Sequence, residues 1–262
     1  MRVTVDDATL EVGSDGRGDA IVLLHGFPLT REIWAQHVAP LASNARVIWP
    51  DLRGMGASSV SDGPYLMESL AGDIANVLDQ LHVERAAFVG HSLGGYVALA
   101  FCRMYSERVA RLALVCSRLA ADSQEIASSR ERLADRIEKD GSVDPAIDAY
   151  LPRLFAPATL SAQPALLDRA REIARVNDPR GAAAMLRGMA QRASSHDIAG
   201  DLLMPVWIVT GALDTIAPVA EAREMARAFP NARVEIMERS AHLPMLEEPE
   251  RFGRVLLEFS RV

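Results

Sequence analysis

The stretch AAFVGHSLGGYVALAF, residues 86–101, decides how this chain is read. Its first four residues form an unbroken apolar run of the kind found in buried strands, and the part after Ser92 has the composition of a buried helix. Between them the serine lies in the pentapeptide GHSLG, residues 90–94. A strand, a G-x-S-x-G turn and a helix form the arrangement called a nucleophile elbow, in which a sharp turn exposes the serine hydroxyl.

The glycines around the serine fit this interpretation. Side chains would collide in so tight a turn, so glycine is expected at Gly90 and Gly94, and Gly95 allows the helix to pack close to the sheet. The helix that begins behind Ser92 offers free backbone N–H groups and the positive end of its dipole to a nearby anion. The alternative is a glycine-rich turn with an incidental serine, which the flanking strand and helix disfavour.

A serine nucleophile needs a base, and the base needs an acid that orients it. His242 lies in RSAHLPMLEEPERF, after the last predicted strand and before the last predicted helix, at the sheet edge where the elbow opens. Asp214, in VTGALDTIAP, follows a buried strand and reaches the same edge. The alternatives are a turn or helix-capping role for Asp214 and a weaker competing acid, Asp122. The predicted catalytic residues are therefore Ser92, Asp214 and His242.

The remainder of the chain alternates short apolar runs with helical patterns. This alternation predicts an α/β fold with a mostly parallel sheet covered on both faces. The expected strands are Val3–Val12, Ala20–Leu24, Arg46–Trp49, Ala86–Val89, Arg111–Cys116, Val206–Thr210 and Arg233–Met237. The expected helices outside the interval 118–203 are Arg31–Leu41, Met67–Leu81, Leu93–Tyr105, Val219–Phe229 and Pro249–Phe259.

The interval 118–203 breaks this rhythm. It shows helical patterns cut by prolines and no convincing strand. A long strandless insertion in an α/β domain is usually a functional lid, although a second packing layer without a further role would look the same. We predict a core formed by residues 1–117 and 204–262, and a helical cap formed by residues 118–203.

Together these motifs resemble the α/β-hydrolase fold superfamily, in its small serine esterase and enol-lactonase-like branch. HGFP at residues 25–28 resembles the oxyanion-loop motif of the family, and DLRGMGASS at 51–59 resembles its D-x-R-G-x-G-x-S turn. GHSLGG, GALD and AHLPMLEEPERF resemble its elbow, acid loop and histidine loop, in the same chain order. The motifs run from residue 25 to 252, and only the cap matches weakly. They are specific for the fold and the triad, and not for the substrate.

The resemblance also implies an oxyanion hole. In this family one donor is the backbone N–H of the residue after the nucleophile, here Leu93, and the other follows the His-Gly pair, here Phe27. Such donors stabilise the negative oxygen of a tetrahedral intermediate. His25 and Arg53 are expected to brace their loops rather than to contact substrate.

The predicted function is a serine hydrolase that cleaves a small carboxylic ester or lactone through an acyl-enzyme on Ser92. An enol-lactonase is attractive because GPYLMESLAGDI, residues 63–74, resembles the corresponding stretch of such enzymes. A carbon–carbon bond hydrolase, a thioesterase and a perhydrolase share the same triad and stay open, as does a ligand receptor with slow turnover. Trp34 and Leu119 are candidates for the pocket lining.

Composition limits the partners. The net charge of −7 and the isoelectric point near 5.4 argue against nucleic acid and anionic membranes. No metal-ligand spacing of His, Cys, Asp or Glu lies near the motifs, so we predict no metal and no cofactor. Cys102 and Cys116 are expected as small buried residues of a helix and a strand, and no signal-peptide pattern is evident. The chain is therefore expected in the cytoplasm, with a small-molecule substrate as partner and its oligomeric state open.

Overall fold

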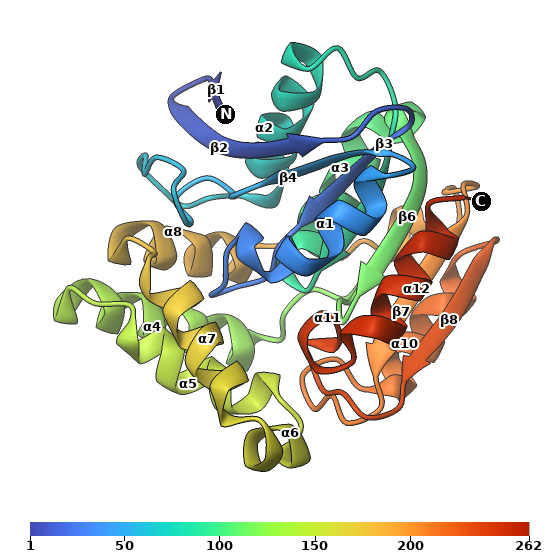
Figure 1. Ribbon diagram of the computed structural model, residues 1–262. Coiled ribbons are helices and arrows are strands. Elements are labelled where there is room, and N and C mark those ends of the chain that lie inside the picture. Colours follow the sequence, from blue (N-terminus) through green and yellow to red (C-terminus); the bar gives the residue numbers. More distant parts are fainter. Residues whose placement is uncertain (262) are drawn as a thin grey trace.

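The protein, described here by a computed structural model of residues 1–261, is built on a single eight-stranded sheet with the order β1-β2-β4-β3-β5-β6-β7-β8 (Figure 1). Neighbouring strands from β4 to β8 pair in parallel, whereas β1 and β2 form an antiparallel extension at one edge. The strands are β1 (Arg2–Val5), β2 (Ala8–Asp15), β3 (Ala20–Leu24), β4 (Arg46–Pro50), β5 (Ala86–His91), β6 (Val109–Val115), β7 (Val206–Gly211) and β8 (Ala232–Met237). The predicted α/β class with a mostly parallel sheet is confirmed.

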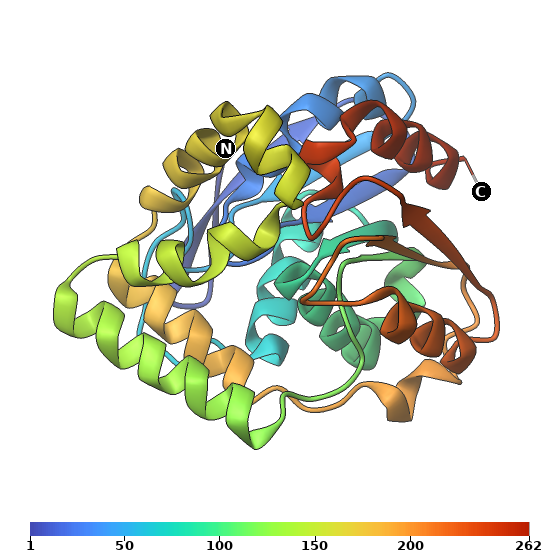
Figure 2. The same cartoon turned by 90° about the horizontal axis from the view of Figure 1, so that it is seen from below.

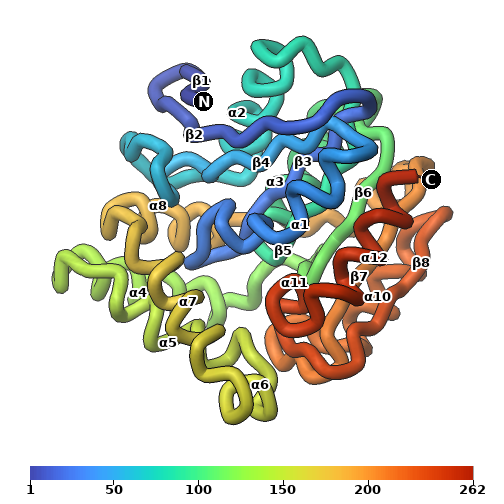
Figure 3. Tube along the Cα trace, viewed as in Figure 1, coloured from blue at the N-terminus to red at the C-terminus, as the bar shows by residue number. Residues whose placement is uncertain are grey.

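Helices cover both faces of this sheet. In Figures 1 and 3, α1 and α12 lie on one face, and α2 and α3 lie on the other. The helices of this core are η1 (Arg31–Trp34, a 3₁₀ turn), α1 (Ala35–Ala42), α2 (Met67–Gln80), α3 (Leu93–Tyr105), η2 (Ser106–Arg108, a second 3₁₀ turn), α10 (Val219–Ala228), α11 (Pro244–Glu247) and α12 (Pro249–Phe259). Because of this double cover, every residue of β3, β5 and β7 is buried, which explains the unbroken apolar runs of the sequence.

The N-terminal segment corrects one prediction. The single expected strand Val3–Val12 is a hairpin, in which β1 and β2 pair with Val5 opposite Ala8. The turn lies at Asp6, which has a positive φ of 23°. The buried positions change from odd to even numbers across it, because the two-residue turn places Val5 opposite Ala8 and directly opposite residues lie on the same face of the sheet. That shift in phase was the signal for a turn within an otherwise strand-like pattern.

A helical insertion follows the carboxyl end of β6 and precedes β7. It consists of α4 (Gln124–Asp140), α5 (Asp144–Leu154), α6 (Pro157–Ala162), α7 (Pro164–Arg175) and α8 (Pro179–Ala190), followed by the short α9 (His196–Ala199). Figure 2 shows α4 and α8 side by side, with the start of α4 next to the end of α8. The insertion begins at the sheet edge that carries the serine, since β5 and β6 run parallel. Its role as a cap, with boundaries at 118 and 203, stays a prediction.

Among residues 1–261, none of the helices combines the length and the apolar character that crossing a bilayer requires.

Candidate active site

The predicted elbow lies between β5 and α3. Ser92 has φ 50° and ψ −111°, a backbone conformation that is costly for a residue with a side chain and is concentrated at functional sites. A Cβ atom on Gly90 would lie 2.4 Å from the carbonyl oxygen of Gly94, and one on Gly94 would lie 2.3 Å from that of Leu24. Only glycine therefore fits at these two positions. The turn leaves Ser92 half-buried at the carboxyl edge of the sheet.

The predicted acid and base meet directly. Asp214 follows β7 and His242 follows β8, and the Asp214 Oδ2 and His242 Nδ1 atoms are 2.7 Å apart. Both residues are buried, Asp214 with 5 % and His242 with 2 % of its surface exposed. With Nδ1 donating to the carboxylate, Nε2 of the neutral imidazole carries a free lone pair. That tautomer is the one a general base requires.

The second oxygen of Asp214 is held by the backbone. Oδ1 accepts from the N–H groups of Ile216 at 2.7 Å and Ala217 at 3.0 Å. Burial alone raises the pKa of the Asp214 carboxyl, but the adjacent His242 imidazole and these hydrogen bonds outweigh burial and bring the pKa below its usual value. The carboxylate is therefore charged at neutral pH, as an acceptor for imidazolium must be.

His91 connects the elbow to His242 through a hydrogen bond. It precedes Ser92 in the chain, and its ring centre is 5.1 Å from that of His242. Its Nε2 donates to the backbone carbonyl of His242 at 2.8 Å. Burial, followed by the nearby His242, lowers the pKa of His91 to about 3, so this ring is neutral at ordinary pH. His91 therefore positions His242 through its main chain.

The two predicted oxyanion donors belong to different segments, Leu93 to the elbow and Phe27 to the loop after β3. Leu93 is the first residue of α3, where backbone N–H groups have no partner inside the helix. Phe27 follows the His25-Gly26 pair at the end of β3. The His25 ring fixes this loop, because its Nδ1 donates to the Gly26 carbonyl at 3.1 Å and its Nε2 accepts from the Leu52 N–H at 3.0 Å. The roles of the Phe27 and Leu93 amides stay predictions.

Arg53 braces its loop, as expected. Its guanidinium forms a two-pronged pair with the Asp73 carboxylate, at 2.8 and 2.6 Å. It also donates to the Ser61 hydroxyl at 3.0 Å and contacts the Asp7 carboxylate in the N-terminal hairpin. All three partners lie outside the elbow, so Arg53 serves the fold.

The structure also places three residues for which the sequence predicted a location: Trp34 and Leu119 in the pocket lining, and Cys116 in a strand. Trp34 is fully buried and stacks on Phe252 of α12, with ring centres 6.2 Å apart, so it belongs to the core rather than to a pocket wall. Leu119 is buried and its carbonyl accepts from the backbone N–H of Ser195, and its place in a pocket lining stays a prediction. Cys116 lies just beyond β6 with a positive φ of 48°, not within the strand as expected.

The alternative acid, Asp122, is engaged elsewhere. Its carboxylate contacts Arg130 at 2.5 Å and Arg192 at 3.3 Å, and both arginines belong to the inserted segment. It has no hydrogen bond to His242 among the described residues, whereas Asp214 does. The geometry therefore favours Asp214 as the partner of the histidine.

One group of side chains has the proximity that a metal site needs. Within residues 1–261, ligand atoms of Cys116, Asp214 and His242 all lie within 4.8 Å of one another. Two of these atoms are already joined to each other by the 2.7 Å hydrogen bond, and burial raises the pKa of the Cys116 thiol well above its usual value. A metal requires a thiolate and a free imidazole nitrogen, so this group fits a hydrogen-bonded pair better than an ion.

Sequence reasoning missed the connection between the insertion and the histidine. The backbone N–H of His242 donates to the carbonyl of Leu154, the last residue of α5, at 3.0 Å. Glu247 of α11 accepts from the Ala241 N–H through Oε1, and from the Ala156 N–H and the Thr159 hydroxyl through Oε2, each at 2.9 Å. The insertion is thus hydrogen-bonded to the histidine loop, residues 238–243. Nothing in the sequence pattern pairs residues about 90 positions apart.

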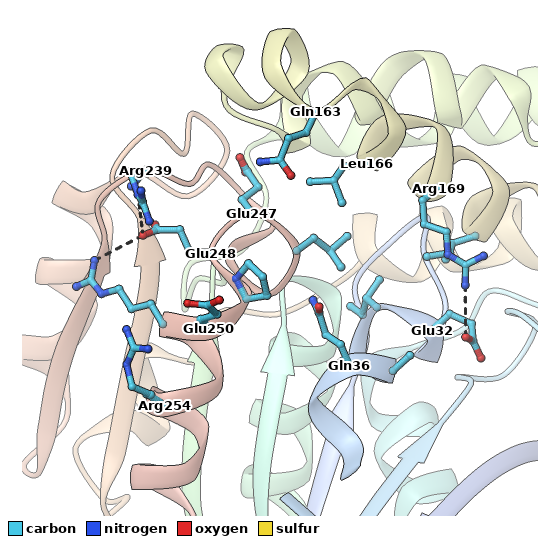
Figure 4. Close-up of a pocket in the computed structure, with 16 residues that line it drawn as sticks. Glu32, Gln36, Gln163, Leu166, Arg169, Arg239, Glu247, Glu248, Glu250 and Arg254 are labelled. Carbon is cyan, nitrogen blue, oxygen red and sulfur yellow. Dashed lines mark hydrogen bonds and ion pairs between the residues drawn. The ribbon is translucent and has the colours of Figure 1, made fainter. Parts of the chain in front are cut away.

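Glu247 also lines a groove of about 610 Å³ (Figure 4). Its walls come from α7, from η1 and α1, and from the start of α12, and charged side chains such as Glu32, Arg169 and Arg254 line it. Ser92, Asp214 and His242 are not among its lining residues. The groove is therefore distinct from the space in front of the serine.

Comparison with known proteins agrees with this geometry. The family described as alpha/beta hydrolase fold matches residues 19–249. The structure is similar to that of a thermophilic esterase from Thermogutta terrifontis, with a TM-score of 0.96 and 35 % identity over 100 % of this chain and 98 % of the other. It is also similar to the enol-lactonase from Burkholderia xenovorans, with a TM-score of 0.92 and 28 % identity over 99 % of both chains.

A curated relative points to the same group of proteins. The chain is 24 % identical to 3-oxoadipate enol-lactonase 2 from Acinetobacter baylyi, over 97 % of this chain and 94 % of that protein. The expected resemblance is thereby confirmed for the fold and for similarity to esterases and enol-lactonases. This chain, with its strained serine turn on a mostly parallel sheet, belongs to the alpha/beta hydrolase fold family.

Proposed function

We propose that the protein is a serine hydrolase that cleaves a small carboxylic ester or lactone through an acyl-enzyme on Ser92. The observation that carries the proposal is the 2.7 Å hydrogen bond between buried His242 and Asp214, in a chain whose Ser92 has the strained backbone of a nucleophile elbow, with φ 50°. A histidine with its Nδ1 fixed by a carboxylate is the base that a serine hydroxyl needs.

The chemistry follows from these positions. Ser92 Oγ attacks the carbonyl carbon while His242 Nε2 takes its proton, and the Asp214 carboxylate stabilises the resulting imidazolium. The backbone N–H groups of Phe27 and Leu93 hold the negative oxygen of the tetrahedral intermediate, each contributing about 3 kcal/mol in a water-poor site. The carbon–oxygen bond then breaks, and His242 gives the proton to the leaving alkoxide. Water attacks the acyl-enzyme by the same route and releases the acid.

The substrate class rests on the relatives. An esterase and an enol-lactonase are similar to this chain over nearly its whole length, at 35 % and 28 % identity. The two names denote an enzyme that acts on esters and an enzyme that acts on an enol-lactone. An ester or lactone is therefore preferred for this chain over a thioester or a carbon–carbon bond.

The test is active-site labelling combined with a substrate panel. An aryl phosphonate should inactivate the protein and add its mass to the peptide that carries Ser92, and Ser92→Ala should abolish both labelling and turnover. Rates on matched esters, lactones and thioesters, compared as kcat/KM, then rank the substrate class. A label on another residue, or full activity in the Ser92→Ala variant, would remove the proposed nucleophile.

A further inference from the structure

The side chain of Asn177 bridges the insertion and two loops of the core. Asn177 lies between α7 and α8 and is only 5 % exposed, so its polar atoms need partners within the protein. Its Nδ2 donates to the backbone carbonyls of Pro28 and Ala174, each at 2.8 Å. Its Oδ1 accepts from the backbone N–H of Gly56 at 2.7 Å. Both amide protons and the amide oxygen are thus engaged, which fixes the orientation of the side chain.

One of the carbonyls that Asn177 binds belongs to the loop of a proposed oxyanion donor. Pro28 directly follows Phe27, whose backbone N–H is expected to face the negative oxygen of the intermediate. This loop is a tight turn, because the Leu29 N–H donates to the Gly26 carbonyl at 3.0 Å. A peptide unit in so short a turn cannot tilt without moving its neighbours. The hydrogen bond to the Pro28 carbonyl therefore limits the directions in which the Phe27 N–H can point.

A second contact from the insertion reaches the same loop. The Tyr150 ring of α5 packs edge-on against the ring of buried Phe27, with centres 5.4 Å apart and an interplanar angle of 79°. Tyr150 is itself held in place, because Arg130 of α4 donates to its hydroxyl at 3.0 Å and is paired with the buried Asp122. The insertion therefore contacts both the main chain and the side chain of the oxyanion loop.

We propose that Asn177 is a positioning residue of the oxyanion hole, which it orients through the Pro28 carbonyl while Tyr150 supports the Phe27 ring. Oxyanion donors act only when they lie about 2.7–3.1 Å from the developing charge, so a small displacement of the Phe27 N–H is costly to the reaction. This inference rests on the proposed hydrolase function and deepens it, since it gives the insertion a part in the chemical step.

The test compares two esters that differ in one atom. 4-Nitrophenyl hexanoate presents an oxygen to the oxyanion hole, whereas its thiono analogue presents a sulfur and keeps the same leaving group. Sulfur is a weak hydrogen-bond acceptor, so a correctly placed hole favours the oxygen ester. The readout, which we call the oxygen preference, is the ratio of kcat/KM for the oxygen ester to kcat/KM for the thiono ester. It is divided by the same ratio for hydrolysis by hydroxide, and we expect it to be well above one in the wild-type protein.

Asn177→Asp is the decisive variant. It replaces the donating Nδ2 group with an oxygen, so the Pro28 carbonyl loses its donor, while the Gly56 N–H keeps an acceptor. We expect the oxygen preference to fall about 10-fold or more, because complete loss of an oxyanion donor costs about 100- to 1000-fold in kcat. The thiono ester should be less affected, since it gains little from the hole. If Asn177→Asp does not fold, Asn177→Ala, which buries no charge, is measured in its place.

Two further changes show where the effect arises. Tyr150→Leu removes the ring contact with Phe27 and should also lower the oxygen preference, whereas Tyr150→Phe keeps the ring and should retain more of it. The matched control is Asn231→Asp, because Asn231 Nδ2 likewise donates to a backbone carbonyl, that of Leu203, at 2.7 Å. This pair precedes β7 and β8, at the amino ends of the strands, so the control should keep the wild-type oxygen preference.

The outcomes separate this inference from the proposed function. A purely structural role of Asn177 would lower kcat/KM for both esters alike, and an unaltered oxygen preference in its variants would overturn the inference and leave the hydrolase standing. A wild-type preference near one would overturn it as well. If the wild-type protein hydrolyses neither ester and Ser92 is not labelled by the phosphonate, the proposed function fails and this inference fails with it.

Discussion

The carboxylate of Asp214 divides its two oxygens between the imidazole and the backbone. This division makes Asp214→Asn a sharp test, because the N–H groups of Ile216 and Ala217 keep the amide oxygen at the Oδ1 position. The amide N–H₂ must then face Nδ1 of His242, which favours the tautomer that carries its proton on Nε2. A protonated Nε2 cannot accept from serine, so we expect kcat to fall about 10⁴-fold.

The measurement is kcat on an activated ester, together with the thermal unfolding midpoint to show that the variant folds. Asp62→Asn, an exposed change of the same chemistry, is the matched control and should retain wild-type activity. A Asp214→Asn variant with near-normal kcat would mean that the orienting acid lies elsewhere.

His91 predicts a specific loss of stability in acid. Its pKa is lowered from 6.5 to about 3, first by burial and then by His242, so between these pH values the unfolded chain binds more protons than the folded one. Stability therefore falls as the pH drops below about 6.5, by up to about 1.4 kcal/mol per pH unit. His91→Gln keeps an N–H donor for the His242 carbonyl and removes the titration.

Urea unfolding at pH 7 and pH 5 checks this expectation. The free energy of unfolding of the wild-type protein should decrease by about 2 kcal/mol more than that of His91→Gln over this interval. The buried His25, whose pKa is also lowered by burial, is present in both proteins and cancels from the comparison. Identical pH dependence in the two proteins would show that His91 is not held neutral by the fold.

At the scale of elements, Glu247 ties α11 to the insertion and to the histidine loop. Its two oxygens accept from Ala241, Ala156 and Thr159, and burial raises the pKa of this carboxyl. Glu247→Gln replaces one accepting oxygen with an N–H₂ group that faces an N–H or a hydroxyl. We expect the free energy of unfolding to fall by about 1.5–3 kcal/mol, the range for hydrogen bonds to a charged group.

The same substitution should lower kcat, because the loop that carries His242 loses one of its anchors. Glu250→Gln, an exposed change three residues along, is the control for both urea unfolding and kcat. If Glu247→Gln matched that control in both measurements, the hydrogen bonds of Glu247 would contribute neither to stability nor to catalysis.

The elements that could be predicted from sequence are those whose cause is local. The elbow could be predicted because its strand, turn and helix are contiguous in the chain. The constraint on Gly90 is also local, whereas the constraint on Gly94 comes from Leu24 on β3. The hairpin of β1 and β2 was not predicted because each half alternates like a strand and only the change of phase between the halves marks the turn. The role of Glu247 could not be predicted, since it depends on side-chain contacts between segments that only the folded chain brings together.

For the molecule as a whole, the distribution of exposed apolar side chains predicts an enzyme that acts on dissolved rather than aggregated substrates. Large apolar side chains that are exposed within residues 1–261 come from separate parts of the chain: Met1, Leu66, Met104, Ile126, Val176, Leu203 and Leu213. Apolar residues of the insertion, such as Ile137, Leu154 and Met185, are buried. An interfacial lipase exposes a broad apolar surface, and such surfaces are uncommon on monomers.

We therefore expect short and medium acyl esters to be preferred and triglyceride emulsions to be poor substrates. The measurement is the initial rate on 4-nitrophenyl esters of increasing acyl length. The same rate is measured on a triglyceride at concentrations below and above its solubility limit. A jump in rate at that limit, together with a steady rise toward the longest chains, would show that the insertion opens a lipid-binding face.

The hydrogen bond from the His242 N–H to the carbonyl of Leu154 makes the position of the proposed base depend on two parts of the chain. Any displacement of the end of α5 from the core must break it, and the main chain of His242 then relies on the contact of its carbonyl with His91. A substitution that loosens the packing of α5 is therefore expected to reach the histidine without touching the sheet.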